Sequence, residues 1–351
     1  MSPRSAKLVS LATALPPHVL PQNEVAAVAR NVFGRRFQDF DRLGRVFDTA
    51  GIERRYGVCP IEWYLEEKGW PERTAVYLDA GADLFVAAAR KALNAGALTA
   101  ADIDTVVTVS STGISTPSLE ARVADTIGFR PDVKRVPIFG LGCAGGITGL
   151  AIASRLAEAM PGSTVLLVVV EVCTLAFRLD KVTKANLVAT ALFGDGAAAC
   201  IVRVGEEGIA EVTGSGEHMW PGTLGIMGWE VEAQGFGVIF DRAIPPFAEH
   251  HLAGALSAIL SKTGTDPQHI DRLLCHPGGA KVVTSIEQAL ALPKGALDHE
   301  RAVLRDFGNM SAPTALFVLA QALRAGLPRN AAVLALGPGF TASCVTLARA
   351  T

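Results

Sequence analysis

The feature that most constrains the fold is an internal repeat, in which one order of segments occurs twice along the chain. In the first copy, residues 96–104 come after a segment with a helical pattern, and they lead through an Ile-Asp pair into the apolar run 106–110. In the second copy, residues 264–271 lead through the same pair into 273–276. Self-similarity of this kind indicates that one supersecondary unit has been used twice.

The similarity continues downstream of both segments. Cys143 and Asn309 are each followed by an apolar helical pattern, a short turn and another apolar run. Either match alone can arise by chance, but two matches in the same order favour a true duplication. We therefore expect two similar βα halves, residues 1–210 and 211–351, that meet face to face, with the functional groups where strand ends of the two halves converge.

Strand-like and helix-like segments alternate through most of the chain, which predicts a layered α/β architecture. The strand candidates are continuous apolar runs, typical of strands that helices cover on both faces. They are residues 105–110, 135–139, 164–172, 197–203, 272–275, 331–336 and 342–347.

Composition excludes several classes of function. The 351 residues carry a formal net charge of −2 with no basic stripe, so a nucleic acid partner is not expected. The longest apolar runs are strand-sized, and no membrane span is expected. Arg4 and Lys7 precede the apolar run 8–15, which resembles a short signal peptide but is equally explained as a first strand.

The six cysteines are scattered, with no Cys-x-x-Cys pair and no zinc-ligand spacing. In a chain of this length they indicate reduced thiols, so we expect a soluble cytoplasmic protein without a metal site.

Cys143 is the strongest candidate for a reactive group. A lone cysteine is usually an inert buried side chain, but Gly142, Gly145 and Gly146 permit a sharp turn from strand to helix around this one. The helix expected from residue 147 onward is apolar around most of its circumference, which is typical of a central buried helix. Its N-terminal amides favour a thiolate, a form suited to acyl capture.

His276 and Asn309 are candidate partners. His276 ends a strand before Pro-Gly-Gly, a turn expected to leave the imidazole exposed; a core histidine is the alternative. Shared ligation of one metal ion by Cys275 and His276 is disfavoured, because strand neighbours face opposite sides. Asn309 suits a turn or helix cap, or an amide donor to a developing oxyanion.

Six segments considered together are more specific than any one residue. They are Gly-Cys-Ala-Gly-Gly at 142–146, Leu-Phe-Gly-Asp-Gly-Ala-Ala-Ala at 192–199, His-Pro-Gly-Gly at 276–279, Gly-Asn-Met-Ser at 308–311, Gly-Pro-Gly-Phe at 337–340, and Arg-Pro-Asp-Val-Lys-Arg-Val at 130–136. On these segments the chain resembles the type III polyketide synthases, the chalcone synthase-like enzymes, over nearly its whole length.

The resemblance implies a thiolase-type fold, layered α-β-α-β-α, and a homodimer. It implies a catalytic triad of Cys143, His276 and Asn309, and a gatekeeper at Phe193, which otherwise suits a core aromatic. Gly337, Pro338 and Gly339 would shape the cavity wall, although an ordinary tight turn is the alternative. The implied substrates are an acyl-CoA starter and malonyl-CoA, without a further cofactor.

Departures from the plant pattern limit what carries over. Val238 replaces a second gatekeeper phenylalanine, and the residues around 228–232 are more similar to bacterial members. Small side chains indicate room for a starter or product other than a coumaroyl-derived one. The remaining cavity candidates are Cys173, Ala176, Ser111, Thr116 and Ser311. Arg54, Arg55 and Lys281 are candidates for contact with CoA phosphates, although the arginines equally suit a solvated surface.

The expected reaction is repeated decarboxylative condensation of malonyl-CoA onto a starter held on Cys143, followed by cyclisation to a pyrone, resorcinol or phloroglucinol-type product. The alternative is a single condensation of the ketoacyl-ACP synthase III kind. Those enzymes usually carry His-Gln-Ala-Asn in place of His-Pro-Gly-Gly at 276–279 and lack Gly-Pro-Gly-Phe. A non-catalytic protein on the same fold is disfavoured because all three triad residues are present.

Overall fold

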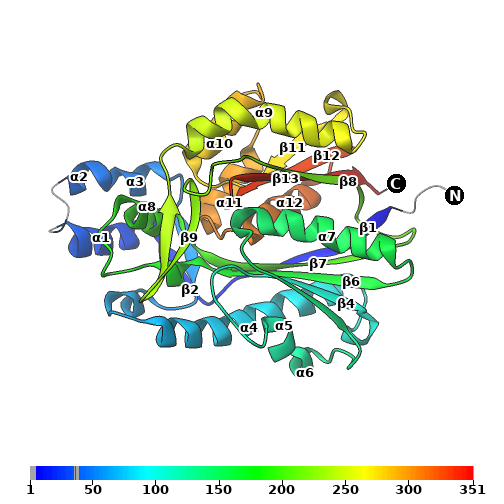
Figure 1. Ribbon diagram of the computed structural model, residues 1–351, viewed down its shortest axis with the longest axis horizontal. Coiled ribbons are helices and arrows are strands. Elements are labelled where there is room, and N and C mark those ends of the chain that lie inside the picture. The colour runs from blue at the N-terminus through cyan, green and yellow to red at the C-terminus, as the bar shows by residue number, and fades with distance from the viewer. Residues whose placement is uncertain (1–4, 35, 37–38, 351) are drawn as a thin grey trace.

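The computed structural model describes residues 5–34, 36 and 39–350 (Figure 1). Arg4 lies outside the described residues, and most of the apolar run that follows it belongs to β1 (Ala6–Ala14), as its interpretation as a first strand predicts. Among the described residues, no helix combines the length and apolar character that crossing a membrane requires.

Within the described chain, nine strands form one continuous mixed sheet that is folded into two layers (Figure 1). Across the sheet the strands are β11 (Arg272–Cys275), β12 (Asn330–Gly337), β13 (Thr341–Arg349), β8 (Ala210–Met219), β1, β7 (Asp195–Val204), β6 (Thr164–Val172), β4 (Thr105–Val109) and β5 (Lys134–Ile138). The two layers join where β1 pairs with β8 over only two residue pairs.

The repeat seen in the sequence recurs in the strand pairing. In the N-terminal half, β4 runs parallel to β6, which pairs antiparallel with β7, which pairs antiparallel with β1. In the C-terminal half, β11 runs parallel to β12, which pairs antiparallel with β13, which pairs antiparallel with β8. The prediction of two similar halves is therefore confirmed, and β5 is an addition to the first half.

Helices form the other three layers. Figure 1 shows α7 (Gly145–Ala159) and α12 (Pro313–Ala325) between the two sheet layers, α4 (Trp70–Ala95) on one outer face, and α9 (Ile244–Lys262) with α10 (Ala280–Ala289) on the other. Residues on every side of α7 are buried, including Ile147 and Leu150, as predicted for a central helix. Apolar side chains of α7 and α12 pack against strands of both halves in one continuous core.

The strand predicted at 135–139 forms as β5, but the prediction that it is buried is wrong. β5 ends the sheet and has β4 as its neighbour on one side alone. Phe139, directly after it, is 58 % exposed. An apolar run fixes the strand but not its place in the sheet, and the sheet edge leaves one side of β5 uncovered.

The remaining helices and strands are mostly short. They are β2 (His18–Pro21), α1 (Gln22–Phe33), α2 (Phe40–Leu43), α3 (Arg45–Thr49), β3 (Arg54–Gly57), α5 (Leu119–Arg122), α6 (Ala124–Ile127), α8 (Lys184–Leu192), β9 (Met227–Glu232), β10 (Gly235–Phe240) and α11 (Asp298–Phe307). β9 and β10 form a separate two-stranded hairpin.

Candidate active site

Cys143 lies in a short 3-10 turn, Gly142–Ala144, that leads directly into α7. Two neighbouring glycines are required by the available space. A Cβ on Gly142, whose φ is +46°, would lie 2.7 Å from the Pro338 ring, and a Cβ on Gly146 would lie 2.2 Å from the Ala312 carbonyl oxygen. This close packing brings the start of α7 against α12 and the turn after β12, so Cys143 lies where the two halves meet.

His276 follows β11 and continues its pairing, since its backbone N–H donates to the Leu334 carbonyl at 2.8 Å. The expectation of an exposed imidazole is wrong, because His276 is only 4 % exposed. The Pro-Gly-Gly turn folds against the end of α8, where a Cβ on Gly279 would lie 3.6 Å from Leu192. Within the described part of the chain, neither ring nitrogen of His276 has a hydrogen-bond partner.

The Asn309 side chain is buried and fixed by two hydrogen bonds. Its Oδ1 accepts from the Ser311 backbone N–H at 2.8 Å, and its Nδ2 donates to the Gly278 carbonyl at 3.2 Å. A carboxamide nitrogen carries two protons, so one N–H is left for a further acceptor.

A chain of contacts brings the three candidates together. Cys143 forms a hydrogen bond with the hydroxyl of Ser311, which lies two residues beyond Asn309. Asn309 in turn contacts Gly278, which lies two residues beyond His276. A thiol, an imidazole and an amide donor from three separate segments therefore share one buried site.

The resting site is neutral. Burial raises the pKa of the Cys143 thiol to about 12, although the hydrogen bond with Ser311 opposes the shift. Burial lowers the pKa of His276 to about 3, so its imidazole is uncharged. Burial of the sulfur thus opposes the thiolate that the start of α7 is expected to favour.

Phe193 follows α8 and meets an aromatic cluster. Its ring centroid lies 5.7 Å from that of Trp229 and 6.5 Å from that of Phe240, both on the β9–β10 hairpin. Its backbone forms an isolated bridge with Asn309, in which the Gly194 N–H donates to the Asn309 carbonyl at 3.0 Å. Phe193, the expected gate, and Asn309, the expected oxyanion donor, are therefore joined directly through their backbones.

Comparison with known proteins covers both halves. Residues 2–206 match the family model for the N-terminal domain of chalcone and stilbene synthases, and residues 211–350 match the model for the C-terminal domain. The chain belongs to the chalcone and stilbene synthase family. It is a type III polyketide synthase, an enzyme of the acyltransferase type, as the sequence motifs predict.

Bacterial relatives are similar over nearly their whole length. The chain is 39 % identical to a 1,3,6,8-tetrahydroxynaphthalene synthase of Streptomyces peucetius subsp. caesius, covering 98 % of this chain and 93 % of the relative. It is 37 % identical to a putative chalcone synthase of Bacillus subtilis, covering 96 % of each. The crystal structure of the Streptomyces coelicolor tetrahydroxynaphthalene synthase superposes with a TM-score of 0.93 at 29 % identity, covering 98 % and 99 % of the two chains.

The other cavity candidates of this polyketide synthase are buried or half-buried, except for Thr116. Cys173 and Ala176 are buried in one 3-10 turn, Cys173–Ala176, and the Ser111 hydroxyl accepts from the backbone N–H of Gly140 at 3.1 Å. Val238 is half-buried on β10. Thr116 is exposed on the surface of the single subunit, and its place in a substrate cavity stays a prediction. It lies in a surface loop after β4, where sequence position gives no indication of depth.

The turn after β12 packs tightly onto the nucleophile segment. A Cβ on Gly337 would lie 2.6 Å from the Ala144 Cβ, and Pro338 contacts Gly142. Gly339 has a φ of +69°, a conformation that favours glycine. The Gly-Pro-Gly sequence thus forms a close-packed wall behind Cys143, more than an ordinary surface turn.

An apolar pocket of about 70 Å³ lies beside Phe193 and Cys173. Side chains from α1, from the segment after β3 and from the segment before α8 line it. They include Val25, Val28, Val32, Ile61, Leu65 and Phe177. A shallower depression that shares Val32 and Leu65 continues outward to Arg36 and Glu67.

The three basic candidates for CoA contact differ in accessibility. Arg54 is half-exposed and pairs with Asp306 at 3.0 Å, and Lys281 is exposed at the start of α10. Arg55 is only 2 % exposed, and its Nη1 donates to the carbonyls of Thr190 at 2.5 Å and Phe193 at 2.9 Å. The prediction of a phosphate contact by Arg55 is corrected, because its guanidinium lies in the interior and supports the backbone before Phe193.

Sequence reasoning missed a buried carboxyl near the nucleophile. Glu171 Oε2 accepts from the Ser111 backbone N–H at 2.9 Å and from the Thr112 hydroxyl at 2.7 Å, while Oε1 has no partner. Burial raises the pKa of Glu171 to about 8, and its charge in turn raises the pKa of Cys143. The available signal was a single acid within the apolar strand 164–172.

Sequence reasoning also missed the aromatic partner of Phe193. Trp229 lies within the segment 228–232, and its ring centroid is 5.7 Å from that of Phe193, the expected gate. No group of three or more His, Cys, Asp or Glu side chains suited to a metal ion occurs within residues 5–34, 36 and 39–350.

Proposed function

We propose that this type III polyketide synthase condenses malonyl-CoA repeatedly onto an acyl-CoA starter held on Cys143. The observation that carries the proposal is the buried convergence of a thiol with an imidazole free at both nitrogens and an amide with one free N–H. Cys143, His276 and Asn309 are the proposed catalytic residues.

Loading begins with the neutral pair. As the Cys143 sulfur attacks the thioester carbonyl of the starter, its proton passes to His276, and the imidazolium then protonates the departing CoA thiolate. The new bond joins Sγ to the acyl carbon, and the bond that breaks joins that carbon to the CoA sulfur. Proton transfer to a free, neutral imidazole avoids the cost of holding a bare thiolate in this buried site.

Extension uses the two donors. We place the thioester carbonyl of malonyl-CoA against an N–H of His276 and the free N–H of Asn309. Loss of CO₂ leaves an electron pair that develops as charge on this oxygen, so two fixed donors lower the barrier. The enolate attacks the acyl carbon on Cys143; a carbon–carbon bond forms, the carbon–sulfur bond breaks, and a chain two carbons longer remains on CoA.

The apolar pocket beside Cys173 and Phe193 supports an aliphatic portion on the starter or on the growing chain. Its lining offers many apolar contacts and few polar groups, which suits an alkyl chain. We propose cyclisation to a pyrone, resorcinol or phloroglucinol-type product. The tetrahydroxynaphthalene synthases among the relatives make a naphthalene product the further possibility for the assay to include.

Each extension takes up one proton from solvent, which restores the Cys143 thiol, and the electrons balance within the CoA thioesters; the proposed chemistry calls for no metal or redox cofactor. Arg54 and Lys281 remain candidates for contact with CoA phosphates, since both are accessible. All six cysteines are free thiols, which supports a cytoplasmic setting.

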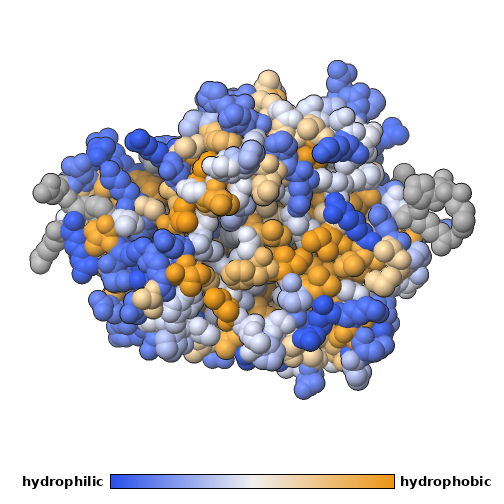
Figure 2. All heavy atoms as spheres, viewed as in Figure 1, coloured by the Kyte–Doolittle hydropathy of each residue, from blue (hydrophilic) through white to orange (hydrophobic). Residues whose placement is uncertain are grey.

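We also propose a homodimer in which β5 pairs with β5 of a second copy. The outer edge of β5 is unpaired, and Ile114 and Phe139 expose large apolar side chains nearby. Figure 2 shows apolar residues gathered toward the middle of one face, with hydrophilic residues around its periphery. Within each subunit, residues 1–210 would carry the nucleophile and residues 211–351 its two partners.

The test is incubation with ¹⁴C-labelled malonyl-CoA, with and without acetyl-, hexanoyl-, dodecanoyl- and benzoyl-CoA. We expect CO₂ release and products extended by two or more malonyl units, identified by mass spectrometry. Absence of CO₂ release with every starter would overturn the proposal. A strict requirement for acyl carrier protein, with a single extension, would favour the ketoacyl-ACP synthase III alternative.

Two cysteine variants identify the nucleophile. Cys143→Ala should abolish condensation, whereas Cys275→Ala should retain most of it, because Cys275 packs within a separate apolar cluster behind β11. Equal loss in both variants, with both proteins folded by circular dichroism, would contradict the assignment of Cys143.

A further inference from the structure

The β9–β10 hairpin packs two aromatic rings against Phe193, yet it lies outside the main sheet. Trp229 on β9 pairs in register with Val238 on β10, and the rings of Trp229 and Phe240 contact Phe193. An isolated two-stranded hairpin is marginally stable in water, so its position must be set by contacts elsewhere.

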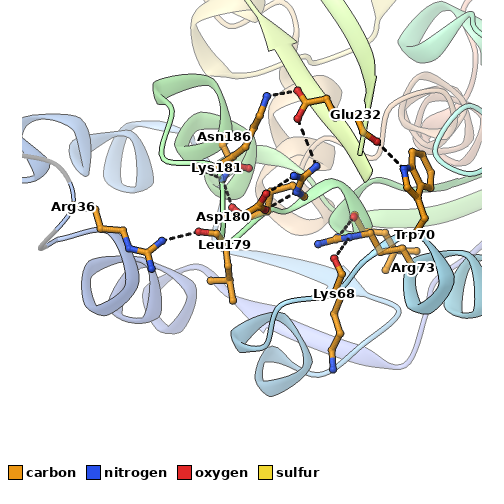
Figure 3. Close-up of polar contacts among 11 residues, drawn as sticks. Arg36, Lys68, Trp70, Arg73, Leu179, Asp180, Lys181, Asn186 and Glu232 are labelled. Carbon is orange, nitrogen blue, oxygen red and sulfur yellow. Dashed lines mark hydrogen bonds and ion pairs between the residues drawn. The ribbon is translucent and has the colours of Figure 1, made fainter. Parts of the chain in front are cut away.

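Glu232, the last residue of β9, provides these contacts (Figure 3). Its carboxylate pairs with Lys181 and lies 3.7 Å from Nη1 of Arg178. Its backbone carbonyl accepts from the Trp70 indole N–H at 2.7 Å. One residue thus ties the hairpin both to the segment before α8 and to the start of α4.

The two cationic partners of Glu232 belong to the segment after the Cys173 turn, and this turn lines the apolar pocket beside Phe193. Arg178 and Lys181 follow directly after the turn that carries Cys173. The Asn186 side chain on α8 donates to the carbonyls of both Arg178 and Lys181, at 2.7 and 2.8 Å. Because α8 ends immediately before Phe193, the same segment that receives Glu232 also supports the gate.

This network holds three cations, Arg73, Arg178 and Lys181, against two carboxylates, Asp180 and Glu232. Arg178 is buried, and its guanidinium donates to Asp180 through Nε at 2.6 Å while its Nη1 faces Glu232 without a closer hydrogen bond. Arg73 lies near enough to Arg178 for the two cations to repel each other. The Glu232 carboxylate therefore offsets the positive charges of Arg178 and Lys181, both of which it faces.

The hairpin backbone is packed directly onto these charged groups. A Cβ on Gly237 would lie 2.0 Å from Glu232 Oε1, and a Cβ on Gly235 would lie 3.2 Å from Cδ of Arg73. The hairpin backbone at Gly235 and Gly237 is therefore in tight contact with Glu232 and Arg73. We expect a change of the Glu232 side chain to shift this backbone.

We propose that Glu232 is a positioning residue that sets the passage between Trp229 and Phe193, and so selects the starter by size. This inference rests on the proposed condensation reaction. Glu232 acts through the hairpin and not on the reacting atoms, because Cys143, His276 and Asn309 are held by other elements.

The test compares Glu232→Gln with wild type in two reactions. We expect the ratio of kcat/KM for dodecanoyl-CoA to kcat/KM for acetyl-CoA to rise about two- to tenfold, the lower part of the range for coupling between contacting residues. Malonyl-CoA decarboxylation without a starter should keep its kcat within a factor of about two, because the variant leaves the reacting groups in place.

The matched control is Glu230→Gln, which removes the same charge from an exposed side chain on the same strand. It should leave the starter ratio unchanged. Lys181→Gln, at the more exposed end of the network, should shift the ratio in the same direction as Glu232→Gln. The double variant should shift it by less than the product of the two single effects.

An unchanged ratio in both Glu232→Gln and Lys181→Gln would overturn the inference. So would an equal fall of condensation and decarboxylation in Glu232→Gln, because that result indicates general loss of structure. If wild type itself releases no CO₂ from malonyl-CoA, the proposed function fails independently of Glu232.

Discussion

Glu171 allows the electrostatics of the site to be tested through stability. The substitution Glu171→Gln keeps the shape of the side chain and retains an oxygen that can accept from the Ser111 N–H and the Thr112 hydroxyl. The amide nitrogen then replaces Oε1, which has no partner, so the neutral variant mimics the protonated acid. Only the ability to ionise is lost.

The expected effect follows from the pKa of Glu171, which burial raises from 4.5 to about 8. Between these values the native protein holds a proton that the unfolded chain has released, so the free energy of unfolding falls as pH rises. The slope is about 1.4 kcal/mol per pH unit while the native group stays protonated. Allowing for partial ionisation near pH 8, the titration of Glu171 should lower the free energy of unfolding of wild type by about 2 kcal/mol from about pH 6 to pH 8.

The assay is urea unfolding of wild type and Glu171→Gln at both pH values, followed by circular dichroism and checked for reversibility. The free energy of unfolding of Glu171→Gln minus that of wild type should be about 2 kcal/mol larger at the higher pH. Other buried acids cancel in this difference. Glu206→Gln, on the exposed turn after β7, is the control and should show no such change. A constant difference across this pH range would refute the reasoning, because it would mean that Glu171 does not titrate there.

Three further substitutions test the geometry. Asn309→Ala should lower malonyl-CoA decarboxylation by about 100- to 1000-fold, the usual effect of removing one oxyanion donor, and a loss below about tenfold would contradict the donor role. Gly146→Ala should yield little folded protein, since its Cβ would lie 2.2 Å from the Ala312 carbonyl oxygen. Gly254→Ala, whose Cβ would enter open space on α9, should instead raise the free energy of unfolding by about 0.5–1 kcal/mol in thermal or urea unfolding; a destabilised Gly254→Ala would show that helix propensity does not decide that position.

The sequence predicted the secondary structure best where apolar runs are long. The run 164–172 coincides with β6, and the apolar pattern after Cys143 forms the central helix α7. Burial was predicted less well, because it depends on what other segments do. β5 has the apolar run of an internal strand, but the strand order places it at the edge.

The same limit explains why the sequence did not predict the burial of His276. A Pro-Gly-Gly turn predicts a bend after His276, but only the tertiary structure shows that the end of α8 packs over it. The residue types of the site were predictable, but the charge of Cys143 was not. A helix N-terminus and a desolvated sulfur act on its pKa in opposite directions, and which effect is larger depends on the depth of burial.

Arg55 shows how two motifs that are distant in sequence become one structural unit. Its guanidinium donates to the Thr190 and Phe193 carbonyls, while its stem occupies the space beside Gly308, where a Cβ would lie 2.7 Å from Arg55 Cγ. The Leu192 carbonyl accepts from the Asn309 N–H at 2.8 Å, which closes the connection. Because one buried side chain supports both backbones, a shift of Phe193 displaces Asn309 as well. The proposed passage past Phe193 and the proposed stabilisation of the enolate oxygen by Asn309 therefore depend on one backbone support, and a variant at either position should be examined for both effects.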